Sequence, residues 1–373
     1  MKKFAGFFLV LILLSLSVFF HQCYPAQEKT DQEKTKIVLV HPSAEYLKSF
    51  LYLIENNIIR ISDLELIAVF YAKTKSDFEK SIKFLEENER PFINLQKIDG
   101  DLNRDNLFQK NSCSNDFYKI FKNSDGILFF GGFDLPPSIY APKTSLLTNI
   151  KNPHRHYFEL SFMFHLLGGS QNDNFQPYLE EKTNYVVNGF CLGMQSMNVA
   201  TGGSLYQDIP SEIYGLKYVE DVLSLDQDQQ HKNYWRALFG DDDLVWCNFH
   251  RIKLVEDQFF IKNLKLSVNE HPYVTSGHHQ AVKHLGKGFK VVATSMDGKV
   301  IEAIAHQKYI NVFGVQFHPE FFDLYAPEEK KYKLTPNDTE LFSQFEILQK
   351  TKSLQFHYQY WRYFGQLFSP RYP

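Results

Sequence analysis

The chain has 373 residues, a length that suffices to bury a full hydrophobic core as one large domain or as two smaller ones. Its formal net charge is only −3, and 22% of its residues are charged, as in an ordinary globular protein. Because the sequence contains no long basic run, we expect no nucleic-acid partner.

The N-terminus has the pattern of an export signal. A positively charged start precedes an apolar run over residues 4–20. We therefore expect a signal peptide or membrane anchor over residues 1–26 and a polar linker over residues 27–35. Three outcomes fit this pattern: cleavage, lipid attachment at Cys23, or retention as an anchor, since the apolar run is close to the lower limit for crossing a bilayer. Each outcome predicts an exported protein, which is periplasmic, secreted or membrane-anchored rather than cytoplasmic.

The segment after the linker alternates between two hydrophobic periods. Apolar runs typical of strands cover residues 36–40, 64–71 and 92–98. Apolar residues at helical spacing cover residues 45–56 and 75–87. Strands that alternate with helices predict a parallel sheet with helices on both faces, which is the doubly wound α/β class.

A further buried strand begins near Asp125 and runs into the glycine pair Gly131-Gly132. In open α/β sheets the ligand crevice lies at the carboxyl ends of the strands, so the backbone N–H of Gly132 could face a developing negative charge. The alternative is a simple end of the strand. A helix is expected to begin at Pro153, and residues 168–182 are mostly polar and predict a loop.

The sequence around Cys191 predicts a sharp turn between a strand and a helix. Residues 183–187 are β-branched and aromatic, and residues 194–200 are apolar at helical spacing. Glycines at 189 and 193 remove side chains that would clash in such a nucleophile elbow. The N-terminus of the following helix favours a thiolate at Cys191. The alternative is a buried structural cysteine.

A histidine and a carboxylate follow a later apolar strand. His318 comes directly after residues 310–317, and Glu320 stands two residues further on. A cysteine nucleophile needs a base, and the base needs a third group to orient it. Residues two apart in an extended segment share a face, so Glu320 can hold the ring of His318. Cys191, His318 and Glu320 therefore form a candidate catalytic set.

Other segments carry weaker signals. Strands over residues 289–295 and 300–305 are expected to meet at an Asp-Gly turn. The acidic and histidine-containing segment 226–231 lacks the regular spacing of a metal motif, so no metal is predicted. Cys113 and Cys247 can either pair after export or remain free thiols.

Three motifs together resemble one known superfamily. Gly-Phe-Cys-Leu-Gly-Met-Gln at residues 189–195 and Phe-His-Pro-Glu at residues 317–320 resemble the class I glutamine amidotransferase-like proteins. Ser-Gly-His-His-Gln at residues 276–280 is similar to the Ser-x-His-His-Gln segment of the γ-glutamyl-γ-aminobutyrate hydrolases. Within the superfamily the chain therefore looks most like that group and the related γ-glutamyl hydrolases.

The resemblance implies a domain organisation. It covers residues 36–322, where it implies a flavodoxin-like, mostly parallel sheet flanked by helices and carrying the nucleophile elbow. Residues 323–373 continue beyond it, and we expect a helical extension there, packed on the domain, with one helix from Asp338 to about Phe364. This extension, rich in aromatic residues, is also compatible with a homodimer contact.

The resemblance further implies an activity, the hydrolysis of a γ-glutamyl amide or isopeptide bond through a thioester on Cys191. It implies a small-molecule γ-glutamyl substrate and neither cofactor nor metal. The family often carries an Arg-Asp-x-x-Glu pattern near Arg155, where this chain has His156 in the acidic position. The implied roles are catalysis by Cys191, His318 and Glu320, oxyanion binding by Gly132 and Leu192, and substrate binding by Gln195, His279, Gln280 and Arg155.

Two other functions are compatible with the same motifs. A glutaminase module would pass ammonia to a synthetase partner, although the chain contains no ATP-binding fingerprint of the GxxxxGK[ST] kind and export would separate it from cytosolic synthetases. A binding module could retain the fold without catalysis. The motifs do not identify the amine side of the substrate.

Overall fold

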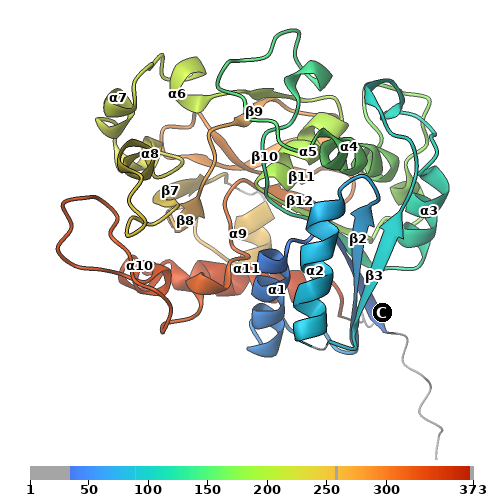
Figure 1. Ribbon diagram of the computed structural model, residues 1–373, viewed down its shortest axis with the longest axis horizontal. Helices are drawn as coiled ribbons and strands as arrows, with labels where there is room; N and C mark the ends of the chain where they lie inside the picture. The colour runs from blue at the N-terminus through green and yellow to red at the C-terminus, as the bar shows by residue number, and fades with distance from the viewer. Residues whose placement is uncertain (1–33, 89, 257–258, 370–373) are drawn as a thin grey trace, which may run out of the picture. The chain divides into compact units, whose positions relative to one another are not determined.

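The computed structural model describes residues 34–369, apart from 89 and 257–258. The predicted export segment over residues 1–26, with Cys23, lies outside the described residues, as does nearly all of the linker. From Lys34 onward the chain forms one compact unit (Figure 1). Within the described part, no helix combines the length and the apolar character needed to cross a bilayer.

A ten-stranded sheet organises this unit, in the order β3-β2-β1-β4-β5-β12-β11-β10-β7-β8 (Figure 1). The strands from β3 to β12 in this order are parallel, and those from β12 to β8 are antiparallel. The strands are β1 (Thr35–Val40), β2 (Leu64–Tyr71), β3 (Ile93–Ile98), β4 (Gly126–Phe129), β5 (Val186–Phe190), β6 (Ser204–Tyr206), β7 (Asn248–Leu254), β8 (Tyr273–Ser276), β9 (Ala281–His284), β10 (Phe289–Ser295), β11 (Ile301–His306) and β12 (Val312–Val315).

The order of the parallel strands is that of the flavodoxin-like fold. When the edge strand β3 is set aside, β2-β1-β4-β5-β12 run in the order second, first, third, fourth and fifth. The chain between β5 and β12 supplies the antiparallel strands and the small β6-β9 sheet. The predicted doubly wound α/β fold is therefore confirmed, and its antiparallel part extends the sheet beyond β12.

Helices cover both faces of the sheet because alternate residues of each strand point to opposite sides. In β1, Ile37 and Leu39 belong to the core that packs against α1, α9, α10 and α11, whereas Val38 and Val40 belong to the core under α3, α4 and α5. The helices are α1 (Ala44–Glu55), α2 (Lys75–Glu87), α3 (Ser114–Lys122), α4 (Pro153–Leu167), α5 (Leu192–Ala200), α6 (Ile209–Glu212), α7 (Val219–Leu223), α8 (Tyr234–Phe239), α9 (Phe259–Leu264), α10 (Gln344–Lys350) and α11 (Leu354–Gln366).

One sequence prediction was wrong: the single helix expected from Asp338 to about Phe364 is two helices, α10 and α11. Lys352, between them, has a φ of 58°, a left-handed conformation that ends a right-handed helix. The first helix, α10, also begins later than predicted, at Gln344 instead of Asp338. Ser343 and Glu346 form a capping box there, which fixes the start of the helix. Because apolar residues recur at helical spacing across residues 338–364, the sequence pattern did not reveal the start of α10 or the break between α10 and α11.

The C-terminal extension packs into the main core. Trp361 of α11 is fully buried, and its ring meets those of Phe50 and Phe190 at centroid distances of 6.2 and 5.8 Å. Its indole N–H donates to the carbonyl oxygen of Pro319 at 2.9 Å. The extension thus contacts the segment that carries His318 and Glu320.

The cysteines at 113 and 247 are free and buried. Burial raises the pKa of the Cys113 thiol to about 11 and that of Cys247 well above its ordinary value. Both thiols are therefore protonated at neutral pH.

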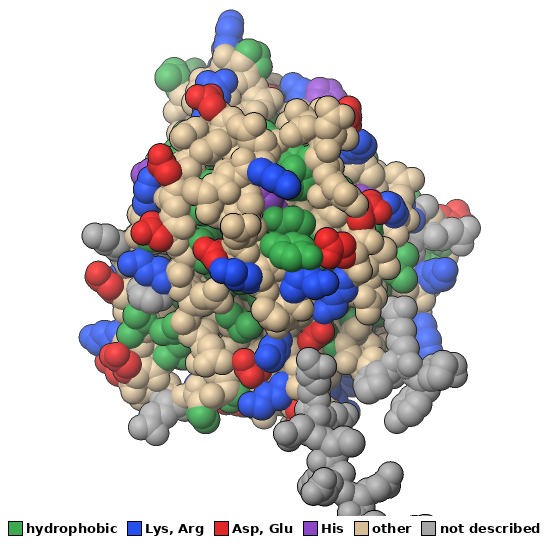
Figure 2. All heavy atoms as spheres, turned by 90° about the vertical axis from the view of Figure 1, so that its right-hand side faces the viewer, with side chains coloured by type: hydrophobic (Ala, Val, Ile, Leu, Met, Phe, Trp, Pro, Cys, Tyr) green, Lys and Arg blue, Asp and Glu red, His purple; other side chains and the backbone are tan. Residues whose placement is uncertain are grey.

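Basic and acidic side chains are interspersed on the side of the molecule that carries β3 and α3 (Figure 2). Such mixing keeps the electrostatic potential of this face low, because neighbouring charges of opposite sign cancel.

Candidate active site

Cys191 lies in a strained turn between β5 and α5. Its φ is 49°, a value that residues other than glycine rarely adopt. The turn closes tightly: a Cβ atom on Gly189 would lie 2.6 Å from the carbonyl carbon of Gly193, and one on Gly193 would lie 2.2 Å from the carbonyl oxygen of Phe129. These distances explain why both neighbours are glycines and why the elbow predicted from the sequence forms here.

The structure brings Cys191, His318 and Glu320 together. His318 Nδ1 lies 2.7 Å from Glu320 Oε1, and Cys191 is close enough to the same ring to raise its pKa. All three side chains are buried, with exposed fractions of 7% for Cys191, 4% for His318 and 1% for Glu320. Burial alone would lower the pKa of His318, but the charges of Glu320 and Cys191 raise it above its ordinary value. The arrangement therefore favours a positively charged His318 ring beside the Cys191 sulfur.

The parallel pairing of β5 and β12 places the base beside the nucleophile. Val315 of β12 is in register with Phe190 of β5, and the Cys191 N–H donates to the Val315 carbonyl oxygen at 2.8 Å. Beyond the end of β12, the His318 N–H donates to the carbonyl oxygen of Thr275 at 2.9 Å. The two motifs, far apart in the sequence, meet because both follow the carboxyl ends of neighbouring strands.

The glycine turn after β4 lies against both motifs. A Cβ on Gly131 would lie 2.8 Å from His318 Cε1, and one on Gly132 would lie 2.8 Å from Leu192 Cδ2. Among the described residues, neither the Gly132 N–H nor the Leu192 N–H has a hydrogen-bond acceptor. Two such donors next to a nucleophile can stabilise an oxyanion, as the sequence analysis expected for these positions.

Arg155 of α4 supports this turn. Its guanidinium donates to the carbonyl oxygen of Gly131 at 2.9 Å and, through Nε, to Glu159 Oε1 at 2.7 Å. Glu159 also contacts His41 Nδ1 at 3.1 Å. Burial raises the pKa of Glu159, but the charge of Arg155 and the hydrogen bond from His41 outweigh it and bring the pKa to about 2. Arg155, predicted to bind substrate, is thus engaged with the backbone behind the glycine turn.

Gln316 was missed as a site residue by the sequence analysis. Its Nε2 donates to the Cys191 sulfur at 3.5 Å. Gln195, predicted to contact substrate, donates through Nε2 to Gln316 Oε1 and to the Gln280 carbonyl oxygen, both at 3.2 Å. The sequence did contain a signal for Gln316. It stands two residues before His318 on the same extended segment, so both side chains are expected on the same face.

His279, also predicted to bind substrate, lies between two carboxylates. Its Nε2 is 3.0 Å from Asp134 Oδ2, and its Nδ1 is 3.1 Å from Asp208 Oδ1. Burial lowers the pKa of His279, but the hydrogen bonds to Asp134 and Asp208 outweigh it and raise the pKa to about 9. Asp134 follows the glycine turn by two residues, so this charged group is linked by a short stretch of chain to the turn that contacts the catalytic set.

The free energy of unfolding is expected to fall as the pH rises from about 6.5 to about 9, because His279 loses its proton in this range. The folded-state pKa is the higher one, so the two ion pairs contribute fully below pH 6.5 and are lost above about pH 9. The shift corresponds to at most about 3 kcal/mol. Urea unfolding of the full-length chain across this range measures it. The variant His279→Gln should show a shallower dependence on pH, and an unchanged dependence would contradict this assignment.

A separate group of buried side chains could hold a metal ion, although the sequence analysis predicted none. It consists of His231, His250, His278 and Glu302. The four residues come from four separate segments of the chain, so no metal-binding motif with regular spacing could be recognised in the sequence.

Comparison with known proteins places these features in a family. Residues 107–320, more than half of the chain, match the model of the peptidase C26 family. Protein NtpR of Enterococcus hirae is 29% identical over 199 residues, which cover 52% of this chain and 66% of that protein. The glutamine amidotransferase-like protein YvdE of Lactococcus lactis is 27% identical over 196 residues, again 52% of this chain and 66% of that protein.

A longer enzyme also matches part of the chain. The glutamine-hydrolysing GMP synthase of Plasmodium falciparum is 27% identical over 173 residues, which cover 46% of this chain and 29% of that enzyme. The chain thus spans just under two thirds of the first two relatives and a smaller share of the third. With the elbow, the glycine turn and the flavodoxin-like strand order, the family match shows that this chain belongs to the peptidase C26 family, within the class I glutamine amidotransferase-like superfamily.

Proposed function

We propose that the protein is a cysteine hydrolase that cleaves γ-glutamyl amide or isopeptide bonds. The observation that carries this proposal is the buried Cys191–His318–Glu320 set beneath the free amides of Gly132 and Leu192. A thiol, a base with its orienting carboxylate and two converging N–H donors are the parts required for acyl transfer. Membership in the peptidase C26 family supports the hydrolase class.

The proposed reaction proceeds through a thioester. In the resting site the His318 ring already holds the proton of the Cys191 thiol. The sulfur then attacks the γ-carbonyl carbon while the carbonyl electron pair moves to oxygen, near the Gly132 and Leu192 amides. Collapse breaks the C–N bond, and the amine leaves with a proton from His318. His318 then deprotonates a water molecule, which attacks the thioester, and glutamate leaves as the Cys191 sulfur is released beside the protonated His318 ring. Glu320 stabilises the imidazolium at each step.

The charged group next to the catalytic set suits a γ-glutamyl moiety. Such a moiety carries an α-ammonium and an α-carboxylate, and the site offers the carboxylates of Asp134 and Asp208 and the cationic ring of His279. Gln195 and Gln280 are the further predicted contacts; Gln280 Oε1 is buried and has no hydrogen-bond partner among the described residues. Arg155 has a positioning role in this scheme, because it holds the Gly131 carbonyl and thereby the oxyanion turn.

Incubation of the full-length chain with a panel of γ-glutamyl amides is expected to release glutamate without any partner protein. The panel should differ in the amine, from γ-aminobutyrate to a further glutamate and to a peptide amine. Cys191→Ala should abolish release. Cys247→Ala, which removes a different buried thiol, should retain it.

The outcomes of this assay separate the alternatives. Release that depends on Cys191 supports the hydrolase, and the order of the amines names its preferred substrate. A folded protein that releases no glutamate and whose Cys191 does not react with an electrophilic γ-glutamyl analogue would contradict the proposal and favour a binding module.

A glutaminase module is the second candidate, because a glutamine-hydrolysing GMP synthase matches part of the chain. In that case free glutamine would be the substrate, and its hydrolysis would rise when a synthetase partner is added. Glutamine included in the same panel distinguishes this activity from cleavage of other γ-glutamyl amides.

A further inference from the structure

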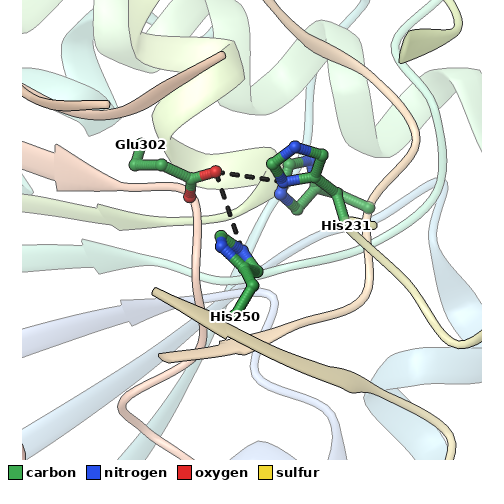
Figure 3. Close-up of side chains that lie close together, drawn as sticks. His231, His250 and Glu302 are labelled. Atoms are coloured by element: carbon green, nitrogen blue, oxygen red, sulfur yellow. Dashed lines mark ion pairs between the residues drawn. The ribbon is translucent and has the colours of Figure 1, made fainter. Parts of the chain in front are cut away.

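Four potential metal ligands converge inside the protein, outside the catalytic set. Figure 3 shows Glu302 of β11 pointing between His231, from the loop before α8, and His250 of β7. His278, just after β8, completes the group, and one ligand atom from each of the four lies within 4.8 Å of all the others. Glu302 Oε1 is 3.1 Å from His231 Nδ1 and 3.7 Å from His250 Nε2.

The group is closed to solvent and poorly satisfied by hydrogen bonds. The exposed fraction is 4% for His278, 1% for His231 and 0% for Glu302. Several polar atoms of the group have no hydrogen-bond partner among the described residues: both carboxylate oxygens of Glu302, both ring nitrogens of His231 and Nε2 of His278. His231 and Glu302 are close to each other, but their contact lacks hydrogen-bond geometry. Buried polar atoms without partners are costly, so their accumulation at one point indicates a ligand.

The backbone prepares two of the histidines for coordination through Nε2. His250 Nδ1 lies 3.1 Å from the Arg251 carbonyl oxygen, and His278 Nδ1 lies 2.9 Å from the Gln280 carbonyl oxygen. A carbonyl oxygen only accepts, so the proton of each neutral ring is on Nδ1 and the lone pair that can bind a metal is on Nε2. Metal-binding histidines usually have such a second contact, which sets tautomer and ring orientation.

We propose that His231, His250, His278 and Glu302 bind one zinc ion in a closed, structural site. Three nitrogen ligands and one oxygen ligand suit zinc in tetrahedral coordination, whereas calcium and magnesium prefer oxygen alone. Bonds of about 2.0–2.1 Å place tetrahedral ligand atoms about 3.3 Å apart, close to the separations around Glu302. His250 Nε2, now 2.7 Å from Ser276 Oγ, exchanges that hydrogen bond for the metal.

The site would fasten four segments that surround the catalytic set. Glu302 lies next to the base-bearing strand, because its carbonyl oxygen accepts from the Gln316 N–H at 2.8 Å. His278 precedes His279, which lies in the charged group by the catalytic set. The zinc ion thus holds β11, β7, the β8–β9 loop and the loop before α8 in place, and this role does not depend on which bond the enzyme cleaves.

Metal analysis of the full-length chain tests the proposal. After exposure to zinc and removal of excess, mass spectrometry of the metals should find about one zinc per folded chain. A strong chelator should remove the zinc and lower the melting temperature, and added zinc, but not magnesium, should restore both. Glu302→Gln should weaken zinc binding by more than the about 10–100-fold typical of an outer-shell substitution, because it removes a ligand.

The control variant His284→Ala removes a histidine from β9, outside the cluster, and should keep its zinc. If Glu302→Gln does not fold, the chelation series on the unmodified chain decides alone. A folded, unmodified chain that binds no zinc and shows no zinc-dependent melting temperature overturns the proposal. Stoichiometric iron or manganese in place of zinc overturns the assignment of the metal.

Discussion

Replacement of His318 by glutamine is expected to lower kcat for γ-glutamyl amide cleavage by about 100- to 10,000-fold. Glutamine keeps a polar side chain of similar length but cannot take the proton from Cys191 or return it to the leaving amine. It also removes the imidazolium that stands between the sulfur and Glu320, so the thiolate loses a neighbouring positive charge. Steady-state kinetics on the substrate that the panel identifies measure the effect.

A second readout separates loss of the base from general damage. Alkylation of Cys191 by iodoacetamide at neutral pH should slow in His318→Gln, while the melting temperature changes little. His284→Ala, which alters a histidine of β9, should leave both kcat and alkylation unchanged. Unchanged kcat in His318→Gln would show that another group accepts the proton and would remove the catalytic role of His318.

Replacement of Trp361 by alanine is expected to destabilise the protein by about 3–5 kcal/mol, the usual cost of removing a large aromatic side chain from a core. Trp361 is fully buried, and its indole N–H donates to the Pro319 carbonyl and to the Tyr325 hydroxyl, both at 2.9 Å. The substitution creates a cavity and leaves the buried Pro319 carbonyl without this donor. Urea unfolding of the full-length chain, followed by circular dichroism, measures the difference in unfolding free energy.

The matched control is Trp235→Ala on α8. Trp235 is half-buried and stacks on the exposed Phe239, so its removal should cost less than about 1 kcal/mol. Pro319 lies between His318 and Glu320, so Trp361→Ala should also lower activity under conditions in which it remains folded. A loss of stability no larger than that of Trp235→Ala would show that α11 contributes little to the core.

Local signals in the sequence were sufficient for most secondary-structure elements. Residues 64–71 and 75–87 were predicted with the bounds that the structure has, because a strand period of two and a helical period near 3.6 are distinct over such lengths. The elbow at Cys191 was also a local signal, since its glycines are demanded by contacts within the turn and with the adjacent strand. Where periodicity continued across a boundary, as between α10 and α11, local signals failed.

The candidate catalytic set of Cys191, His318 and Glu320 could be predicted from the sequence, because these residues lie in two short motifs whose local residue pattern is recognisable. Only the tertiary structure decided which distant side chains join them. Gln316 at the sulfur, Asp208 beside His279 and the cluster of His231, His250, His278 and Glu302 depend on the order of strands in the sheet. That order results from the packing of whole layers around two cores, so no short segment of the sequence encodes it.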